Sequence, residues 1–215
     1  MAGLQEAIAL AERYHRGQYR KSGEPYIAHP MRVMRFLEKH NFPEEALIAA
    51  VLHDVCEDSK LSNVEMSQLF GTRVGFVVNA LSKNRKPKRT EQLKQEYEAR
   101  KDKRRVSDLE RYNNFDEYVD YRCHLYINRI YTGIMADPRV FFIKIADKID
   151  NISDMEAFSP AKRQKKIQEL EQHFVPIYQK SESIFSLNTE TFTEYQTFFR
   201  SLHTALQQAK TLYAL

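Results

Sequence analysis

The feature that most constrains this chain is the stretch from Ala46 to Asp58, which reads ALIAAVLHDVCED. Its first seven residues are all apolar, and a helix that is apolar on every side is a buried helix. Its second half then carries one imidazole and three carboxylates. Ionisable groups are costly to bury unless they are paired or bind a metal ion. We therefore interpret this stretch as a core helix that ends in a functional site.

The polar residues of this stretch form two pairs spaced four apart, His53 with Glu57 and Asp54 with Asp58. Residues four apart lie on one face of a helix. A continuous helix through Asp58 would therefore place each pair on a shared face. The alternative is a solvated helix end with an incidental histidine, because carboxylates are usually found on surfaces.

The composition indicates an all-α protein with one sizeable core. Six glycines and seven prolines are few for 215 residues, of which 42% are hydrophobic, and long stretches without either residue favour helices. The net charge of +4 suits an anionic partner but is low for a dedicated nucleic-acid binder. No signal peptide is evident, and no apolar run approaches the roughly 20 residues of a membrane span. We expect a cytoplasmic protein with no membrane partner.

Helical periodicity organises the rest of the chain. Apolar residues recur at helical spacing in the segments 4–14, 30–37, 64–70, 72–81, 115–137, 138–155, 160–182 and 189–213. We expect a single domain, with residues 1–158 forming the functional core and 159–215 forming additional C-terminal helices. The aromatic stripe from Phe192 to Leu202 closes either the core or an interface in a homo-oligomer.

Residues 83–121 form an insertion that interrupts this pattern. The segment 83–105, KNRKPKRTEQLKQEYEARKDKRR, is mostly charged and has few apolar residues to bury. Acidic residues interrupt its basic run, and aromatic residues that stack on bases are scarce. We therefore do not expect a nucleic-acid partner. An RNA-binding arm at 83–105 is the alternative.

Residue types that bind metal ions occur in three separate segments. They are His29, the adjacent pair His53 and Asp54, and Asp147. Two imidazoles and two carboxylates form a mixed nitrogen and oxygen set that suits Mn²⁺, Fe²⁺ or Zn²⁺. A lone histidine is more often a packing residue, but the polar cluster after the core helix favours the metal interpretation of His29.

The acidic residues of segment 138–155 have a competing explanation. Lys144 and Lys148 would match some of these acids at the protein surface. Asp147 is the acid that this explanation fits least, because apolar residues flank it on both sides.

A divalent ion held by these residues supports one class of reaction. Such an ion polarises a phosphate and lowers the pKa of bound water. Glu57 and Asp58 are placed to orient that water or carry its proton, and Arg20 and Lys21 to meet the negative charge of a substrate. The set predicts hydrolysis of a phosphate ester or anhydride.

Four segments, in this order and spacing, resemble the hydrolase domain of the RelA/SpoT proteins: GQYRKSGEPYIAHP, LIAAVLHDVCED, LFGTRVGFVV and IKIADKIDN. That domain belongs to the HD superfamily, named for a His-Asp pair that corresponds to His53 and Asp54. The resemblance covers about residues 4–82 and 122–155. It implies an HD-domain helical bundle that removes the 3′-pyrophosphate from the alarmones ppGpp and pppGpp, giving GDP or GTP and pyrophosphate.

The resemblance also implies roles for individual residues. The residues that would hold a Mn²⁺ ion are His29, His53, Asp54 and Asp147. Those that would activate water are Glu57 and Asp58. Those that would border the nucleotide phosphates are Arg20, Lys21 and Ser22, and Asn151 would contact the ribose or base region.

Two departures from the long RelA/SpoT enzymes bear on function. In 215 residues we expect no synthetase domain, so the chain resembles the free-standing small alarmone hydrolases. Asp150 stands where the long enzymes have histidine, which leaves the nucleotide open. The alternatives are an adenosine alarmone, the 2′-phosphate of NADPH, a simple nucleotide, or a nucleotide-sensing module without catalysis.

Overall fold

The computed structural model describes residues 2–58, 61–82, 98 and 115–214, and of residues 58 and 115–122 it describes the backbone alone. Within these ranges every regular element is a helix, apart from one isolated β-bridge between Tyr19 and Pro25. The expected all-α fold is confirmed. Most of the predicted insertion 83–121, including nearly all of the segment 83–105, lies outside the described residues.

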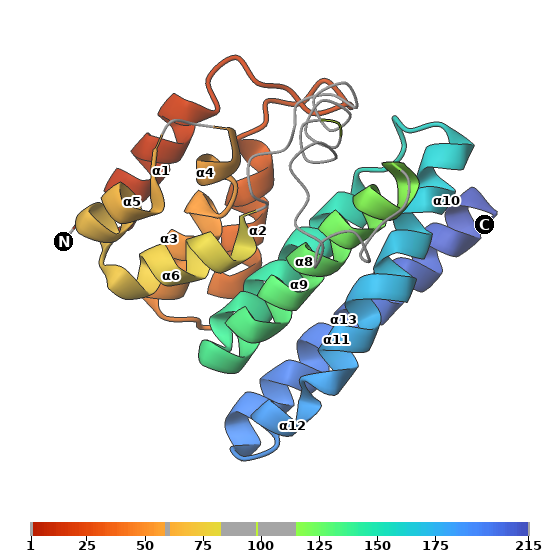
Figure 1. The fold of residues 1–215 in the computed structure, drawn as a ribbon. Helices are drawn as coiled ribbons and strands as arrows, with labels where there is room; N and C mark the ends of the chain where they lie inside the picture. Colours follow the sequence, from red (N-terminus) through yellow and green to blue (C-terminus); the bar gives the residue numbers. More distant parts are fainter. Residues whose placement is uncertain (1, 59–60, 83–97, 99–114, 215) are drawn as a thin grey trace.

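The described helices follow one another in the order shown in Figure 1. They are α1 (Leu4–Tyr14), α2 (Ala28–Glu38), α3 (Glu44–Leu52), α4 (Val55–Asp58), α5 (Asn63–Phe70), α6 (Thr72–Leu81), α8 (Phe115–Ala136), α9 (Arg139–Ser153), α10 (Pro160–Glu169), η2 (Leu170–Phe174), α11 (Val175–Lys180), α12 (Glu182–Phe185) and α13 (Thr189–Tyr213). None of them has the length and hydropathy of a membrane span within the described ranges.

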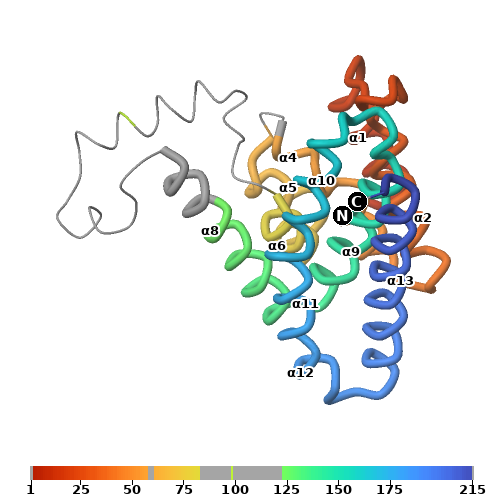
Figure 2. Tube along the Cα trace, turned by 90° about the vertical axis from the view of Figure 1, so that its right-hand side faces the viewer, coloured from red at the N-terminus to blue at the C-terminus, as the bar shows by residue number. Residues whose placement is uncertain are grey.

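Helix α9 is the central element of the bundle. It packs against α2, α3 and α6 on one side, against α8 along its length, and against α13 on the other side. Figure 1 shows α8 and α9 running side by side between the group α1–α6 and the group α10–α13. In the view of Figure 2, α13 lies along the outside of the bundle beside α9. Buried residues of α9 therefore contact helices from both parts of the chain.

Helix α3 is buried on every side, as its sequence predicts. All residues from Ala46 to Leu52 are at most 8% exposed. The predicted continuous helix through Asp58 is wrong, because α3 ends at Leu52 and His53 and Asp54 form a turn before α4. The Glu57 amide donates to the carbonyl of Asp54, three residues earlier, whereas in a continuous α-helix it would donate to the residue four earlier.

The predicted helix over 160–182 is divided in the structure. Helix α10 passes into the π-helix η2, then into α11 and α12. Pro176, the second residue of α11, has no amide hydrogen, and its ring crowds the carbonyl of residue 172. A widened π turn just before the proline accommodates both effects.

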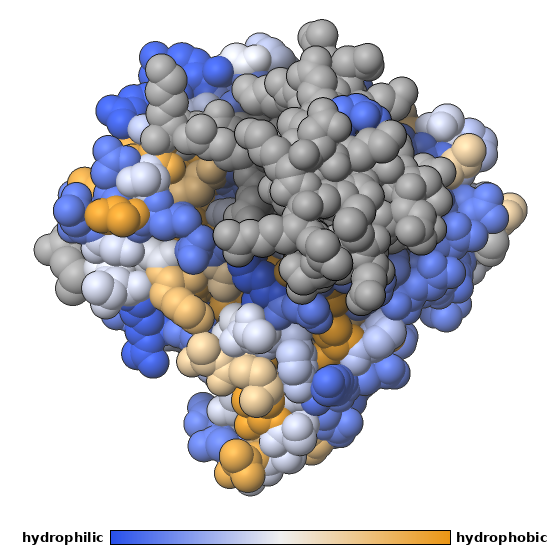
Figure 3. Space-filling model, viewed as in Figure 1, coloured by the Kyte–Doolittle hydropathy of each residue, from blue (hydrophilic) through white to orange (hydrophobic). Residues whose placement is uncertain are grey.

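The aromatic stripe of α13 closes the core of the single chain. Tyr195, Phe198 and Leu202 are at most 3% exposed, and the Phe198 ring lies 5.0 Å from that of Phe142 on α9. Outside the residues drawn in grey, the face seen in Figure 3 mixes hydrophilic areas with apolar ones. Homo-oligomerisation stays a prediction.

Candidate metal centre

The turn after α3 aims His53 and Asp54 at the same point. His53 is 1% exposed, and its Nδ1 donates to the Ala50 carbonyl over 2.7 Å. Because a carbonyl only accepts, Nδ1 carries a proton and Nε2 is the ring nitrogen turned toward the centre. Both residues belong to the turn that links α3 to α4.

His29 enters the same region from the second residue of α2. It is 1% exposed, and its Nδ1 lies 2.7 Å from Oδ2 of Asp150. Its Nε2 lies 3.3 Å from Oδ1 of Asp147 and 3.7 Å from Oδ2 of Asp54. Both histidines are thus anchored through Nδ1 and present Nε2 to the carboxylates.

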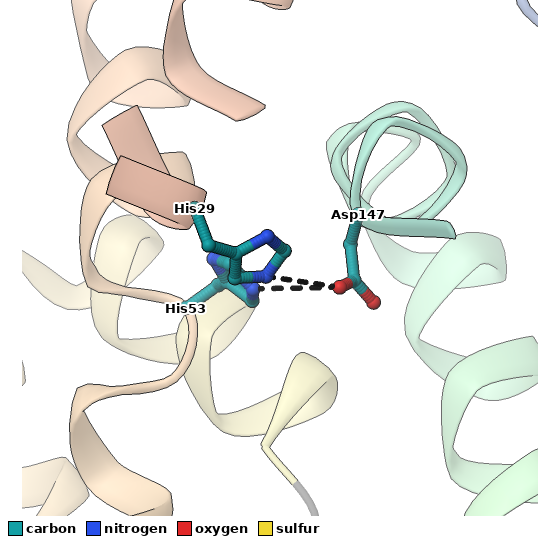
Figure 4. A group of neighbouring side chains, drawn as sticks. All are labelled: His29, His53 and Asp147. Atoms are coloured by element: carbon teal, nitrogen blue, oxygen red, sulfur yellow. Dashed lines mark ion pairs between the residues drawn. The ribbon is translucent and has the colours of Figure 1, made fainter. Parts of the chain in front are cut away.

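Asp147 faces the two imidazoles from the middle of α9. Its Oδ1 lies 3.3 Å from Nε2 of His29 and 3.8 Å from Nε2 of His53. One ligand atom from each of these three buried residues lies within 4.8 Å of the others. Figure 4 shows both rings reaching toward the carboxylate across the space between the helices.

Asp54 lies at the edge of this group. Its Oδ2 is 3.4 Å from Nε2 of His53 and accepts a hydrogen bond of 2.6 Å from the Tyr26 hydroxyl. Burial and the Asp54 charge raise the pKa of Tyr26 well above its usual range, so the phenol remains a donor. We did not predict Tyr26 from the sequence, where its position three residues before His29 was the available signal.

The carboxylates of the centre favour positive charge on both imidazoles. Burial alone would lower the pKa of His29, but hydrogen bonds to Asp147 and Asp150 raise it to about 9. Burial likewise opposes the charge of His53, whose pKa is raised by Asp54 and Asp147. The carboxylates of the centre thus offer a site suited to a positive charge.

The donor set fits a divalent metal ion. The buried Nε2 of His53 has no hydrogen-bond partner in the part of the chain that the structure describes. Two imidazole nitrogens and two carboxylates around one point suit a borderline transition metal and leave positions open for other ligands. Below, the His/Asp centre denotes His29, His53, Asp54 and Asp147.

Lys144 corrects one expectation from the sequence. We considered it a surface partner for the acids of α9, but it is 4% exposed and its Nζ lies 2.8 Å from Oδ2 of Asp147. Although burial favours neutral forms, this pair keeps the pKa of Lys144 well above and that of Asp147 well below the usual values. The spacing of three residues on one helix was the signal that could have identified the pair.

A cavity of about 210 Å³ opens beside the His/Asp centre. Glu57, 7% exposed, shares this cavity with Asp54 and Asp147. Its other lining residues include three lysines and an aromatic ring, namely Lys144, Lys148, Lys166 and Phe158. Lys166 comes from α10, so the C-terminal helices help to form the cavity. The side chain of Asp58 lies outside the described residues.

Three of the four predicted substrate residues meet at the C-terminal end of α9. Arg20 contacts Asp154, and its Nη2 lies 3.3 Å from Oδ1 of Asn151. Ser22 lies 3.5 Å from Asp154, and Asn151 donates to the backbone carbonyl of Asp147 over 2.9 Å. Lys21, by contrast, is exposed on the loop before α2.

Comparisons with known proteins give the family. The family model described as HD domain matches residues 7–181. The bifunctional (p)ppGpp synthase/hydrolase SpoT of Escherichia coli K12 is 31% identical over 174 residues, which are 81% of this chain and 21% of that protein. A guanosine-3′,5′-bis(diphosphate) 3′-pyrophosphohydrolase of Borreliella burgdorferi is 30% identical over 185 residues, 86% of this chain and 23% of that protein.

A protein named GTP pyrophosphokinase, from Streptomyces antibioticus, is 29% identical over 81% of this chain and 17% of its own length. The chain thus spans about a fifth of the length of the curated relatives it matches. A solved structure, of a metazoan ortholog of SpoT described as hydrolysing ppGpp, covers 93% of this chain and 95% of its own, with a TM-score of 0.62 and 22% identity. The structural likeness confirms the fold, and the matched family model shows that this chain belongs to the HD domain family.

Proposed function

We propose that this protein is a Mn²⁺-dependent hydrolase that removes the 3′-pyrophosphate from ppGpp and pppGpp. The observation that carries the proposal is the convergence of two imidazoles and two carboxylates beside a cavity that also holds Glu57. The names of the relatives from Escherichia coli and Borreliella burgdorferi support the choice of substrate. The same donors also suit Zn²⁺ and Fe²⁺, and we propose Mn²⁺ from among these three ions.

The metal ligands in this proposal are His29, His53, Asp54 and Asp147. A bound divalent ion supplies Lewis acidity, polarising a phosphoryl oxygen and lowering the pKa of a coordinated water. The Tyr26 hydroxyl and the Lys144 ammonium each bind one carboxylate oxygen, of Asp54 and Asp147 respectively. The Lys144 contact leaves Oδ1 of Asp147 facing the two imidazoles. The Tyr26 hydroxyl donates to Oδ2 of Asp54, the same oxygen that faces His53, and both contacts would orient these carboxylates as metal ligands.

Glu57 is the proposed general base. Glu57 lines the cavity together with Asp54 and Asp147, and a carboxylate there can accept a proton from the attacking water. Asp58 assists it in the proposal. Arg20, Lys21, Ser22 and Asn151 are the proposed substrate-binding residues, and the lysines of the cavity add positive charge for a diphosphate.

Metal-stripped protein incubated with ppGpp, with and without Mn²⁺, tests the proposal. We expect GDP and pyrophosphate only when Mn²⁺ is present. Cleavage of an adenosine alarmone or NADPH in place of ppGpp would overturn the substrate, and Mn²⁺ binding without cleavage of any of them would favour a sensing module. Hydrolysis that proceeds equally without Mn²⁺ would overturn the metal-dependent mechanism.

Two substitutions separate the proposed roles. Asp54→Ala should abolish Mn²⁺ binding, measured by calorimetry. Glu57→Gln should keep the metal and lower kcat by about 10²- to 10⁴-fold, the usual contribution of general base catalysis. Glu12→Gln, at an exposed position of α1, is the matched control and should change neither Mn²⁺ binding nor kcat. Near-normal turnover in Glu57→Gln would show that its role is misassigned.

The remaining parts of the proposal stay predictions. They are a cytoplasmic location, a boundary between core and C-terminal helices at residue 158, and a small-molecule nucleotide as the partner. The matched family model extends past residue 158 to residue 181.

A further inference from the structure

The two histidines of the His/Asp centre are anchored by different kinds of acceptor. Nδ1 of His53 donates to a backbone carbonyl, that of Ala50, within its own helix. Nδ1 of His29 instead lies 2.7 Å from a carboxylate oxygen of Asp150, contributed by another helix more than 100 residues away in sequence. A carbonyl is fixed by the backbone, whereas a carboxylate needs its own partners to stay in place.

Asp150 has such partners on its outer side. The Arg32 guanidinium approaches it with two nitrogens, Nε toward Oδ1 and Nη2 at 3.3 Å from Oδ2. The third nitrogen of Arg32, Nη1, lies 2.7 and 2.8 Å from the two oxygens of Glu24. Arg20 adds a contact of 3.3 Å to Oδ2 of Asp150. The Asp150 side chain is only 10% exposed, so this network fixes its orientation.

Asp150 does not line the cavity beside the His/Asp centre. It lines a separate cavity of about 640 Å³ between α2 and α9, on the other side of the His29 ring from Asp147. A nucleotide in the smaller cavity would therefore meet Asn151 rather than Asp150. Asp150, where this chain differs from the long RelA/SpoT enzymes, therefore lies next to His29, a proposed metal ligand, and outside the smaller cavity.

We infer that Asp150 is a positioning residue for the metal centre: it holds the Nδ1–H of His29 so that the Nε2 lone pair points at the ion. The inference rests on the proposed function, in which His29 is a metal ligand. A carboxylate behind a ligating histidine fixes its tautomer and ring orientation and increases its basicity. The loop residue Glu24 and Arg32 of α2 complete the support, because they hold Asp150 in place.

The size of the effect follows from known metal sites. Loss of such a supporting group usually weakens metal binding by about 10- to 100-fold. Asp150→Asn keeps the shape of the side chain and one acceptor oxygen while it removes the charge. Asp154→Asn is the matched control, because Asp154 lies one turn further along and contacts Arg20 as Asp150 does. The hydrogen bonds of Asp154 in the described part of the chain go to Arg20 and Ser22, and His29 is not among its partners.

Calorimetric titration of metal-stripped protein with Mn²⁺ provides the first measurement. We expect Asp150→Asn to raise the Kd by about 10- to 100-fold, and Asp154→Asn to leave it within about twofold of the unmodified protein. Equal Kd values for Asp150→Asn and the unmodified protein would overturn the inference. An equal loss in both variants would also overturn it, because the effect would then be one of general charge. Failure of the unmodified protein to bind Mn²⁺ would instead overturn the proposed function.

The second measurement starts from the unmodified protein, where no variant has to fold. In the unmodified protein loaded with diamagnetic Zn²⁺, long-range ¹H–¹⁵N spectra should show the His29 ring proton on Nδ1, strongly deshielded by the carboxylate. In Asp150→Asn this resonance should move upfield, while in Asp154→Asn it should stay in place. A His29 ring that carries its proton on Nε2 in the unmodified protein would overturn the inference.

Discussion

Helix α9 separates two buried regions of opposite character. Toward the N-terminal helices it contributes Asp147 and Lys144 to the His/Asp centre and its surroundings. Toward the C-terminal helices it contributes Phe141 and Phe142 to what we call the aromatic cluster. Its members, all at most 3% exposed, are Phe141, Phe142, Tyr178, Phe185, Tyr195 and Phe198.

The two regions hold together by different forces. In the aromatic cluster the Phe141 ring lies 4.9 to 5.4 Å from four neighbouring rings, and burial of apolar area stabilises the fold. In the His/Asp centre each buried charge is tolerated only because an opposite charge or a proton faces it. The stability that comes from the aromatic cluster should therefore be independent of metal and pH, whereas the stability and function that depend on the polar region should respond to both.

The largest expected effect is on activity, at Asp147. Asp147→Ala removes the carboxylate that faces both imidazoles, and with it the metal ion. Because Lewis acidity contributes several kcal/mol and 1.36 kcal/mol is tenfold, hydrolysis should fall by roughly ten-thousandfold. Product formation and Mn²⁺ content measure this. More than a tenth of normal activity would contradict the proposed role of Asp147.

A matched pair on α9 tests the contrast in stability. Phe141→Ala should lower the free energy of unfolding by about 3–5 kcal/mol, as for other buried aromatic truncations. Lys144→Met should cost a similar amount, about 3–5 kcal/mol, in metal-free protein, because it removes the buried cation that faces Oδ2 of Asp147. Urea denaturation measures both.

Adding Mn²⁺ should distinguish the two variants. The ion supplies the positive charge that Lys144→Met lacks, so it should stabilise that variant more than the unmodified protein. Phe141→Ala should gain only what the unmodified protein gains. Identical Mn²⁺ responses in the two variants would show that the ion does not replace the charge of Lys144.

The pH dependence of the metal-free protein is the next largest effect. The pKa of His29 rises from 6.5 in the unfolded chain to about 9 in the fold. A raised pKa stabilises the fold fully below pH 6.5, and this stability is lost as the pH rises through about 9. The loss should be about 3 kcal/mol at 1.36 kcal/mol per pKa unit.

Urea denaturation in EDTA between pH 6 and pH 9.5 measures this loss. Excess Mn²⁺ should reduce the dependence, because a bound ion displaces the ring proton from Nε2. His29→Gln in EDTA is the control and should show a shallower slope. Stability that rises over this interval would contradict the assignment of the raised pKa to His29.

The smallest expected effect lies in the aromatic cluster. The Tyr195 hydroxyl donates to the Tyr178 carbonyl over 3.1 Å. Tyr195→Phe should lower the free energy of unfolding by about 1 kcal/mol, the net value of one hydrogen bond. The Kd for Mn²⁺ should stay unchanged. A weaker Kd in this variant would show that the aromatic cluster also supports the metal centre.

Much of the fold could be predicted from helical periodicity. The first helix was predicted at 4–14 and the last at 189–213, and α1 and α13 have these bounds. The break after Leu52 could not be predicted, because the residues on both sides of it continue a helical pattern. The turn forms where His53 and Asp54 meet partners from α2 and α9, and those partners are distant in sequence.

The candidate site was predicted in part. The four residues proposed to bind metal come together in the structure, but their roles stay predictions. Lys144 was expected at the surface, because lysine is rarely buried. Its burial depends on Asp147 three residues away and on the helices around it. Lys166 of α10 lines the smaller cavity, and no local pattern in the sequence indicated this position.

The sequence by itself determined the residue types of the centre, the helical class of the fold and the burial of α3, because these depend on composition and on spacing within a few residues. Only the tertiary structure decided that His29, His53 and Asp147 face one another, and that Asp150 supports His29 rather than facing the smaller cavity. Periodicity specifies which face of a helix is apolar. Which polar side chains meet between helices depends on how those faces pack, and packing joins residues more than 100 positions apart.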